Sequence, residues 1–247
     1  MLMVLFVLGT MMTSFLVLLG HRIPKQQSTG GRSQCDHCGQ TIPWYGIVPV
    51  LGWFFVRGKC VHCGVEVSFW YPLSELLGGL IFLFGYLLLR DNMVEYSITM
   101  VFVMLMITVS VSDLKYQVVP DKVLLFFLPL ILVLRMVYPL TTWYYSLLGG
   151  VLGFLFMWLM AYYGKKRFKK EALGGGDIKL YFLIGLFLEV HLVFLSLLFA
   201  SLLGLLFGKL CIKKMTYLPF VPFIFAGVML AYFLGPMILT WYIGVLI

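Results

Sequence analysis

GGGDIKLYFLIGLFLEV, residues 174–190, sets an aspartate directly behind three glycines and in front of an apolar run. An ionisable side chain at a membrane boundary is costly unless it faces protein or water, so Asp177 is a candidate functional residue. Asp113 has the same setting at the end of another apolar run, in Ser112-Asp113-Leu114-Lys115. We interpret the two carboxylates as one catalytic pair.

Apolar runs dominate the rest of the chain. Of its 247 residues, 62% are hydrophobic and 11% are charged. This composition predicts an all-α polytopic membrane protein, because most of the runs are long enough to cross a bilayer as helices. The net charge of +8 does not indicate nucleic acid as a partner, since the basic residues lie in short loops between apolar runs. We expect the lipid bilayer as a partner and no nucleic acid.

About eight apolar segments are expected to cross the membrane. Basic residues follow the first segment and none precede it, which places the amino terminus outside. With alternating sides, the loops 21–70, 113–122, 164–179 and 208–217 are cytoplasmic and hold 16 of the 18 Lys and Arg residues. The segments are roughly 2–19, 71–89, 96–111, 123–138, 143–163, 178–190, 192–210 and 220–247.

This topology divides the chain into three parts. Residues 1–20 form the first transmembrane helix, which we expect to be retained because it lacks the basic n-region and cleavage site of a signal peptide. Residues 21–70 form a small cytoplasmic domain between the first and second helices. Residues 71–247 form a seven-helix membrane domain that carries both aspartates.

Two C-x2-C-G sequences mark the cytoplasmic domain. Four thiolates at this spacing suit tetrahedral zinc, and a disulfide pair, the alternative, is disfavoured in a reducing cytoplasm. His37 and His62 could substitute as ligands. A closed site of this kind is structural, since it folds a loop too small to hold a core of its own. The predicted metal ligands are Cys35, Cys38, Cys60 and Cys63.

Both aspartates fall at the cytoplasmic face in this topology, because the third segment ends inside at Asp113 and the sixth begins inside at Asp177. When two carboxylates lie close, the ionised one can take a proton from water while the protonated one polarises a peptide carbonyl. This chemistry is peptide hydrolysis without a covalent intermediate. The sequence lacks a Ser/His/Asp arrangement, a Walker loop and an H-E-x-x-H run, which argues against serine, nucleotide-driven and zinc hydrolysis.

Three other polar residues receive structural interpretations. Asp121 could replace Asp113 as the catalytic acid, but its place before the fourth segment favours an N-terminal cap. Glu75 is interpreted as a satisfied structural residue, with the orientation of a basic group or of a second-site ligand as the alternative. Arg135 is expected either to be buried against a carbonyl or acidic partner or to face the outer interface.

Several stretches together match the signature of one family. Asp113 through Pro120-Asp121 fits a D-x6-P-D stretch, and Gly174 to Asp177 fits the G-x-G-D stretch of intramembrane aspartyl proteases. The chain resembles the type IV prepilin leader peptidases over nearly its whole length. One departure lies at Tyr45–Pro49, where members often show an acidic residue and Asn before Ile-Pro. The other matching stretches are 14–24, 57–60, 71–77 and the two cysteine knuckles.

This resemblance implies an enzyme that removes the short basic leader of prepilin-like or pseudopilin precursors at the cytoplasmic face of the bacterial plasma membrane, with Asp113 and Asp177 as its dyad. Such an enzyme would serve a pilus, secretion or DNA-uptake machine. The resemblance also implies methylation of the new amino terminus with S-adenosylmethionine, an activity associated with the cytoplasmic domain. Two alternatives remain: an intramembrane aspartyl protease with other substrates, and a transporter whose aspartates relay protons or cations, with the zinc domain as a docking module.

Overall fold

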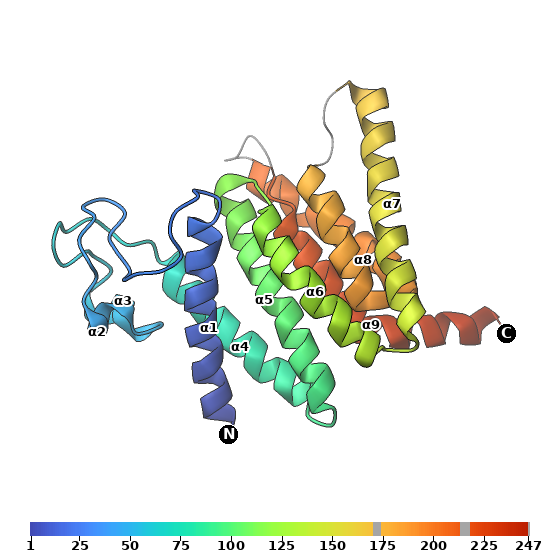
Figure 1. Cartoon of the computed structure of the whole chain (residues 1–247), viewed down its shortest axis with the longest axis horizontal. Coiled ribbons are helices and arrows are strands. Elements are labelled where there is room, and N and C mark those ends of the chain that lie inside the picture. Colours follow the sequence, from blue (N-terminus) through green and yellow to red (C-terminus); the bar gives the residue numbers. More distant parts are fainter. Residues whose placement is uncertain (170–173, 213–217, 247) are drawn as a thin grey trace. The chain divides into compact units, whose positions relative to one another are not determined.

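The computed structural model describes residues 1–169, 174–212 and 218–246, and this part of the chain is helical apart from loops and two isolated β-bridges (Figure 1). The all-α prediction is therefore confirmed. Parts of two predicted cytoplasmic loops, residues 170–173 and 213–217, lie outside the described residues. The helices are α1 (Leu2–Arg22), α2 (Trp44–Ile47), α3 (Leu51–Phe55), α4 (Trp70–Leu89), α5 (Met93–Tyr116), α6 (Asp121–Val137), α7 (Trp143–Phe168), α8 (Gly175–Ile212) and α9 (Val221–Leu246).

Among the described residues, six helices are long and apolar enough to cross a membrane: α1, α4, α5, α7, α8 and α9. The prediction of about eight crossings differs from this number for two reasons. The 17-residue helix α6 is short and includes Asp121, Lys122 and Arg135. In addition, α8 is two helices joined at Glu189, whose φ of 64° and ψ of 173° are not helical.

The two halves of α8 run back along each other. A Cβ placed on Gly153 would lie 2.9 Å from the Tyr181 carbonyl oxygen and 3.1 Å from Cγ2 of Val193, so these two residues of α8 are close neighbours. In a straight helix, residues this far apart in sequence would be separated by roughly 18 Å. The chain therefore reverses at Glu189, and the two halves correspond to the predicted sixth and seventh segments.

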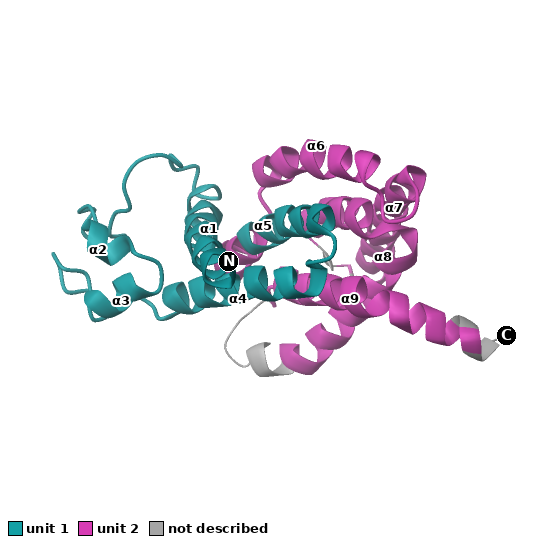
Figure 2. Ribbon diagram, turned by 90° about the horizontal axis from the view of Figure 1, so that it is seen from below, with its two compact units in different colours: residues 1–108 teal, residues 109–247 magenta. Residues whose placement is uncertain are grey.

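Two compact units make up the chain, Met1–Thr108 and Val109–Ile247 (Figure 2). In the first unit, α1 and α4 pack closely because small residues face each other. A Cβ placed on Gly78 would overlap the Thr13 side chain, and one on Gly9 would lie 2.7 Å from Cβ of Phe82. This close approach fixes the membrane helices on either side of the cysteine-containing loop.

In the second unit, α7, α8 and α9 form the packed body, and α8 carries Asp177. A Cβ on Gly149 would lie 2.5 Å from the Gly185 carbonyl oxygen, and one on Gly227 would lie 2.6 Å from the Ala200 nitrogen. The interior contains fully buried side chains from α8 and α9. They include Leu180, Ile184, Leu186, Phe187, Val221, Ile224 and Val228.

Polar side chains close the turn inside α8. Glu189 is buried and accepts hydrogen bonds from the Thr141 backbone N–H at 3.0 Å and the Thr141 hydroxyl at 2.6 Å. Arg135 is also buried; its Nη1 donates to the Tyr138 carbonyl at 3.4 Å, and its guanidinium lies 4.7 Å from the centre of the Phe187 ring. Burial of Arg135 against a carbonyl, one of the two predicted placements, is therefore confirmed.

Candidate active site and metal centre

Asp113 lies in the last turn of α5 and is only 8% exposed. Its Oδ2 accepts a hydrogen bond of 2.9 Å from the backbone N–H of Val221, and the Phe220 N–H also interacts with the carboxylate. These donors belong to the start of α9, where a helix presents free N–H groups and partial positive charge. Asp113 is thus held between the end of α5 and the beginning of α9.

The loop after Asp113 is fixed by hydrogen bonds close to it. The Ser112 hydroxyl donates to the Val118 carbonyl at 2.5 Å, and the Gln117 N–H donates to the Asp113 carbonyl at 2.9 Å. Gln117 has a φ of 54°, which turns the chain away from the helix axis. The bonds therefore set the direction in which residues 117–120 leave α5.

Asp177 lies in the first turn of α8, where its N–H donates to the Gly174 carbonyl at 3.2 Å. Its side chain is partly exposed. The carboxyl group interacts electrostatically with that of Asp113 and with the buried Tyr181. The two aspartates therefore lie at the same end of the second unit.

Two further contacts bring the α5–α6 loop against the start of α8. A Cβ on Gly176 would lie 2.6 Å from Cβ of Val119, so only glycine fits there without a shift. The Lys179 ammonium group lies 2.8 and 2.9 Å from the two carboxylate oxygens of Asp121. Stretches far apart in the sequence, around Asp113 and around Asp177, are therefore in direct contact.

The preferred role of Asp121, an N-terminal cap, is wrong. Asp121 is the first residue of α6, the cap position belongs to Pro120, and no side chain caps the helix. The Asp121 carboxylate binds Lys179 instead, and its side chain is 60% exposed. The buried carboxyl of this stretch is that of Asp113.

The two cysteine knuckles of the first unit have nearly the same backbone structure. In the first, the Cys35 N–H donates to the Gln40 carbonyl and the Gly39 N–H donates to the Cys35 carbonyl, both at 2.9 Å. In the second, the equivalent bonds join Cys60 to Val65 at 2.8 Å and Gly64 to Cys60 at 2.9 Å. Gly39 and Gly64 have φ values of 70° and 71°, a conformation that favours glycine. This similarity explains the glycine after each C-x2-C.

The four cysteine sulfurs are grouped as a metal site requires. All lie within 4.8 Å of one another, with 3.9 Å between the sulfurs of Cys35 and Cys63 and 4.0 Å between those of Cys38 and Cys60. Sulfur atoms around tetrahedral zinc are about 3.8 Å apart, given a zinc–sulfur distance of about 2.3 Å. The four cysteines are free thiols, so the set could hold a metal ion.

Backbone N–H groups favour the thiolate form of the first cysteine in each knuckle. The N–H groups of Cys63 and His62 lower the pKa of Cys60 to about 6, and those of Cys38 and His37 lower the pKa of Cys35. Burial and the neighbouring thiols raise the pKa of Cys63. Because thiolates are the form that binds metal, the backbone donors prepare Cys35 and Cys60 as ligands.

Comparison with known proteins identifies the family of this chain. Residues 7–90 match the Bacterial Peptidase A24 N-terminal domain, and residues 100–209 match the Type IV leader peptidase family. A prepilin leader peptidase/N-methyltransferase of Bacillus subtilis is 36% identical over 98% of both chains. The chain belongs to the type IV leader peptidase family. This family membership confirms the resemblance found in the sequence.

Two other relatives extend this likeness. A prepilin leader peptidase/N-methyltransferase of Myxococcus xanthus is 37% identical over 83% of this chain and 62% of its own length. A type 4 prepilin-like proteins leader peptide-processing enzyme of Escherichia coli is 31% identical over 79% of this chain and 73% of its own length. No solved structure matches. Together with the six apolar helices, family membership makes the chain a multi-pass membrane peptidase.

Glu75 is a structural residue whose carboxylate has a hydrogen-bond partner within the protein, as its preferred interpretation predicted. One of its carboxylate oxygens accepts a hydrogen bond of 2.6 Å from the Val50 N–H, and the Ser14 side chain lies close to the carboxylate. The residue therefore ties the segment between the knuckles to α1 and α4.

Sequence reasoning missed Lys179 as the partner of Asp121 and Glu189 as a buried acid. Glu189 could have been recognised, because it is an acid that interrupts a long apolar stretch. Lys179 carried no such signal, since its partner lies far away in the sequence.

Proposed function

We propose that this chain cleaves the leader peptide of type IV prepilin-like precursors, with Asp113 and Asp177 as its catalytic pair. The proposal rests above all on the contact between the two motif stretches, which brings the buried Asp113 close to Asp177 in one unit. The names of the relatives supply the substrate class. The charge of the loops places the site at the cytoplasmic face of the bacterial plasma membrane in this proposal.

The geometry suggests different roles for the two carboxyl groups. Asp113 receives backbone N–H groups from the start of α9, which favour negative charge at its Oδ2. We assign it the role of the base that takes a proton from the attacking water. Asp177, in its protonated form, donates a hydrogen bond to the scissile carbonyl. The proton taken by Asp113 then passes to the leaving amine.

We propose zinc as the metal of the four-cysteine cluster. Four thiolates leave no open position on the ion, so the metal would stabilise the two knuckles and take no part in peptide cleavage. A second activity, methylation of the new amino terminus with S-adenosylmethionine, belongs to the same proposal; the names of the relatives include an N-methyltransferase activity.

Co-expression with a prepilin-like precursor tests the catalytic pair. Asp113→Asn and Asp177→Asn keep the shape of each side chain but cannot exchange the proton, so each should slow cleavage by roughly 10²–10⁴-fold. Asp121→Asn is the matched control, and we expect its cleavage to stay within a few-fold of wild type. The measurement is the ratio of processed to unprocessed precursor by gel mobility and mass spectrometry.

Two results would contradict the assignment. Cleavage by both Asp113→Asn and Asp177→Asn at the wild-type rate would remove the proposed peptidase mechanism. Loss of cleavage in Asp121→Asn together with full cleavage in Asp113→Asn would transfer the catalytic role to Asp121.

A further inference from the structure

An apolar stretch joins the two cysteine knuckles. Residues 42–56 read IPWYGIVPVLGWFFV and contain no charged side chain, while Arg57 and Lys59 follow directly. A run of this length is too short to cross a bilayer. Such runs are typical of buried helices or of segments that enter one face of a membrane without crossing it.

The stretch is not a buried helix. It forms α2 and α3, of which α2 has no buried residue and α3 has only Gly52. The Trp44 side chain is 77% exposed and that of Phe55 is 62% exposed, and Ile47, Leu51 and Phe54 are exposed as well. Contiguous exposed apolar side chains of this size mark an interaction surface.

Hydrogen bonds place this surface beside the membrane helices. The Val50 N–H, between α2 and α3, donates to Glu75 in the second turn of α4, and the Glu75 carboxylate lies close to the Ser14 side chain of α1. Ser14 lies eight residues before Arg22, the end of α1, which is about 12 Å along a helix. In Figure 1, α2 and α3 likewise lie beside α1 and α4 and not beyond the ends of these helices.

The apolar surface continues onto the membrane-facing surface of the same unit. Phe69 and Trp70, at the start of α4, are 54% and 74% exposed, and Leu76 and Leu77 extend the exposed apolar face along that helix. Exposed side chains on a transmembrane helix contact lipid. We therefore expect lipid to cover the exposed apolar side chains of α2 and α3 as well.

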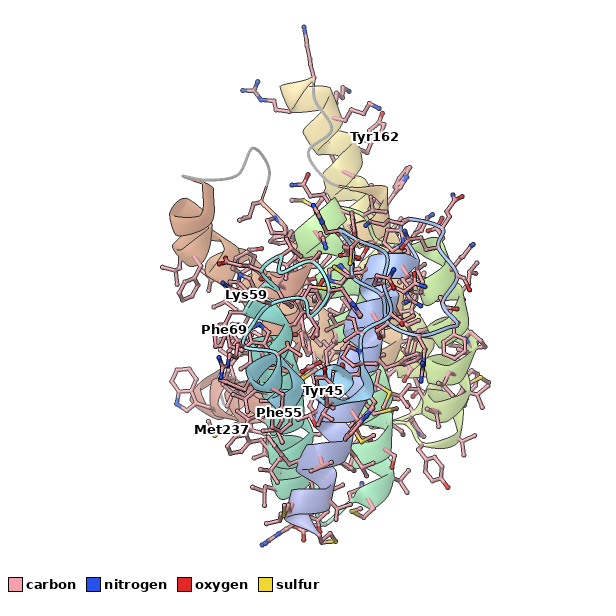
Figure 3. All side chains as sticks on the ribbon, turned by 90° about the vertical axis from the view of Figure 1, so that its left-hand side faces the viewer. Tyr45, Phe55, Lys59, Phe69, Tyr162 and Met237 are labelled. Carbon is pink, nitrogen blue, oxygen red and sulfur yellow. The ribbon has the colours of Figure 1, made fainter. Side chains whose placement is uncertain are left out.

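Charge and aromatic side chains are ordered as at a membrane interface. In Figure 3, Lys59 lies above Phe69, and Phe55 lies below both. In an interfacial segment, Lys and Arg lie at the level of the headgroups and aromatic rings lie next to the acyl chains. The polar groups of the stretch also find protein partners: the Trp53 indole donates to the Val67 carbonyl at 2.9 Å, and the Gly52 N–H donates to the Val48 carbonyl at 2.7 Å.

We propose that residues 43–56 form a re-entrant interfacial segment whose aromatic face inserts into the acyl region of the leaflet next to the four-cysteine cluster. The segment anchors the knuckles at the bilayer surface, and Arg57 and Lys59 lie among the headgroups. Glu75 holds the turn of the segment at this depth. This inference concerns the first unit and does not depend on the catalytic role of the aspartates.

Photocrosslinking of the full chain in phospholipid vesicles tests the inserted surface. A benzophenone amino acid replaces Phe55 in one variant and Trp44 in another. The control variant carries it at Val61, which is 54% exposed but lies within the second knuckle, between two cysteines. We expect lipid adducts at Phe55 and Trp44 in at least fivefold excess over Val61, measured by mass spectrometry of the intact protein. Equal labelling at Val61, no lipid adduct at Phe55 and Trp44, or adducts to a second protein chain in their place would overturn the proposal.

A second measurement keeps the chain almost unchanged. The difference in tryptophan fluorescence between wild type and Trp44→Phe gives the contribution of Trp44. In vesicles whose lipids carry bromine on the acyl chains, we expect most of this contribution to be quenched, and aqueous iodide should have little effect on it. Quenching by iodide without quenching by brominated lipid would place Trp44 in water and contradict insertion.

Discussion

The cysteine cluster and the aspartate pair are assembled in opposite ways. All four cysteines lie between Cys35 and Cys63, and local turns with their own hydrogen bonds aim the sulfurs at one point. The aspartate site needs the ends of α5, α8 and α9, with contacts from the α5–α6 loop to the start of α8. The first site depends on local turns, and the second depends on helix packing. Substitutions should therefore affect the two sites separately.

The largest effect that is confined to one of the two sites is expected from Cys60→Ser. A structural zinc site contributes about 10–16 kcal/mol of binding free energy, and Cys60→Ser replaces one of the four thiolates with a hydroxyl, a much poorer zinc ligand. We expect the variant to lose its bound metal and its ability to methylate a processed precursor, while leader cleavage continues. Metal content by elemental analysis and the mass of the precursor's amino terminus are the measurements.

Cys211→Ser is the chemical control for this change, because it removes the cysteine outside the two knuckles. It should keep both metal and methylation. If Cys60→Ser abolished cleavage as completely as Asp113→Asn in protein that is still inserted in the membrane, the two sites would not be independent.

The next effect is expected at Gly176, the contact between the two motif stretches. In Gly176→Ala the new methyl group meets Val119 at 2.6 Å and must move the α5–α6 loop. A displacement of about 1 Å in a catalytic site costs roughly 10²-fold in rate, so we expect cleavage to fall by that order. The initial rate of precursor processing measures it.

Gly175→Ala provides a matched control, because a Cβ at Gly175 meets nothing within 4 Å. It should cleave at nearly the wild-type rate. The double variant Gly176→Ala with Val119→Gly should recover activity, since it removes the Cβ and both methyl groups of Val119 that the new methyl group meets. A loss in Gly176→Ala that Val119→Gly does not repair would show that this contact does not set the geometry of the site.

The same contrast explains what the sequence could predict. The knuckles were recognisable because ligand spacing and the following glycines are local features, and the membrane helices because each apolar run is continuous. Charge alternation alone placed Asp113 and Asp177 at the same end. The sequence could not reveal that Val221 donates to Asp113 or that Lys179 binds Asp121, because these contacts depend on how α5, α6, α8 and α9 pack.

Helix boundaries show a similar division. The turn at Glu189 agrees with the predicted break between the sixth and seventh segments, because an acid there interrupts two apolar runs. The role of Asp121 was mistaken because an aspartate after Pro120 is typical of a helix start. Its carboxylate instead binds Lys179 of α8, and no side chain caps α6.

The smallest effect is expected from that ion pair. Asp121 and Lys179 have side chains that are 60% and 54% exposed, and an exposed pair contributes about 0.2–1 kcal/mol. Lys179→Met should therefore slow cleavage by no more than about fivefold. Adding Asp121→Asn to it should cause little further loss, because the interaction is already gone. Initial rates for wild type, both single variants and the double variant give the coupling energy.

Salt distinguishes this supporting role from a catalytic one. At an ionic strength of about 1 M the Debye length is roughly 3 Å, so the attraction between the two charges is weakened. The difference in cleavage rate between Lys179→Met and wild type should then shrink. Glu at position 121 keeps the charge, so Asp121→Glu should retain more activity than Asp121→Asn. A loss above roughly 10²-fold in Asp121→Asn that persists at high salt would give Asp121 a direct part in bond cleavage. The contact between the two motif stretches would then supply a third carboxyl group to the reaction.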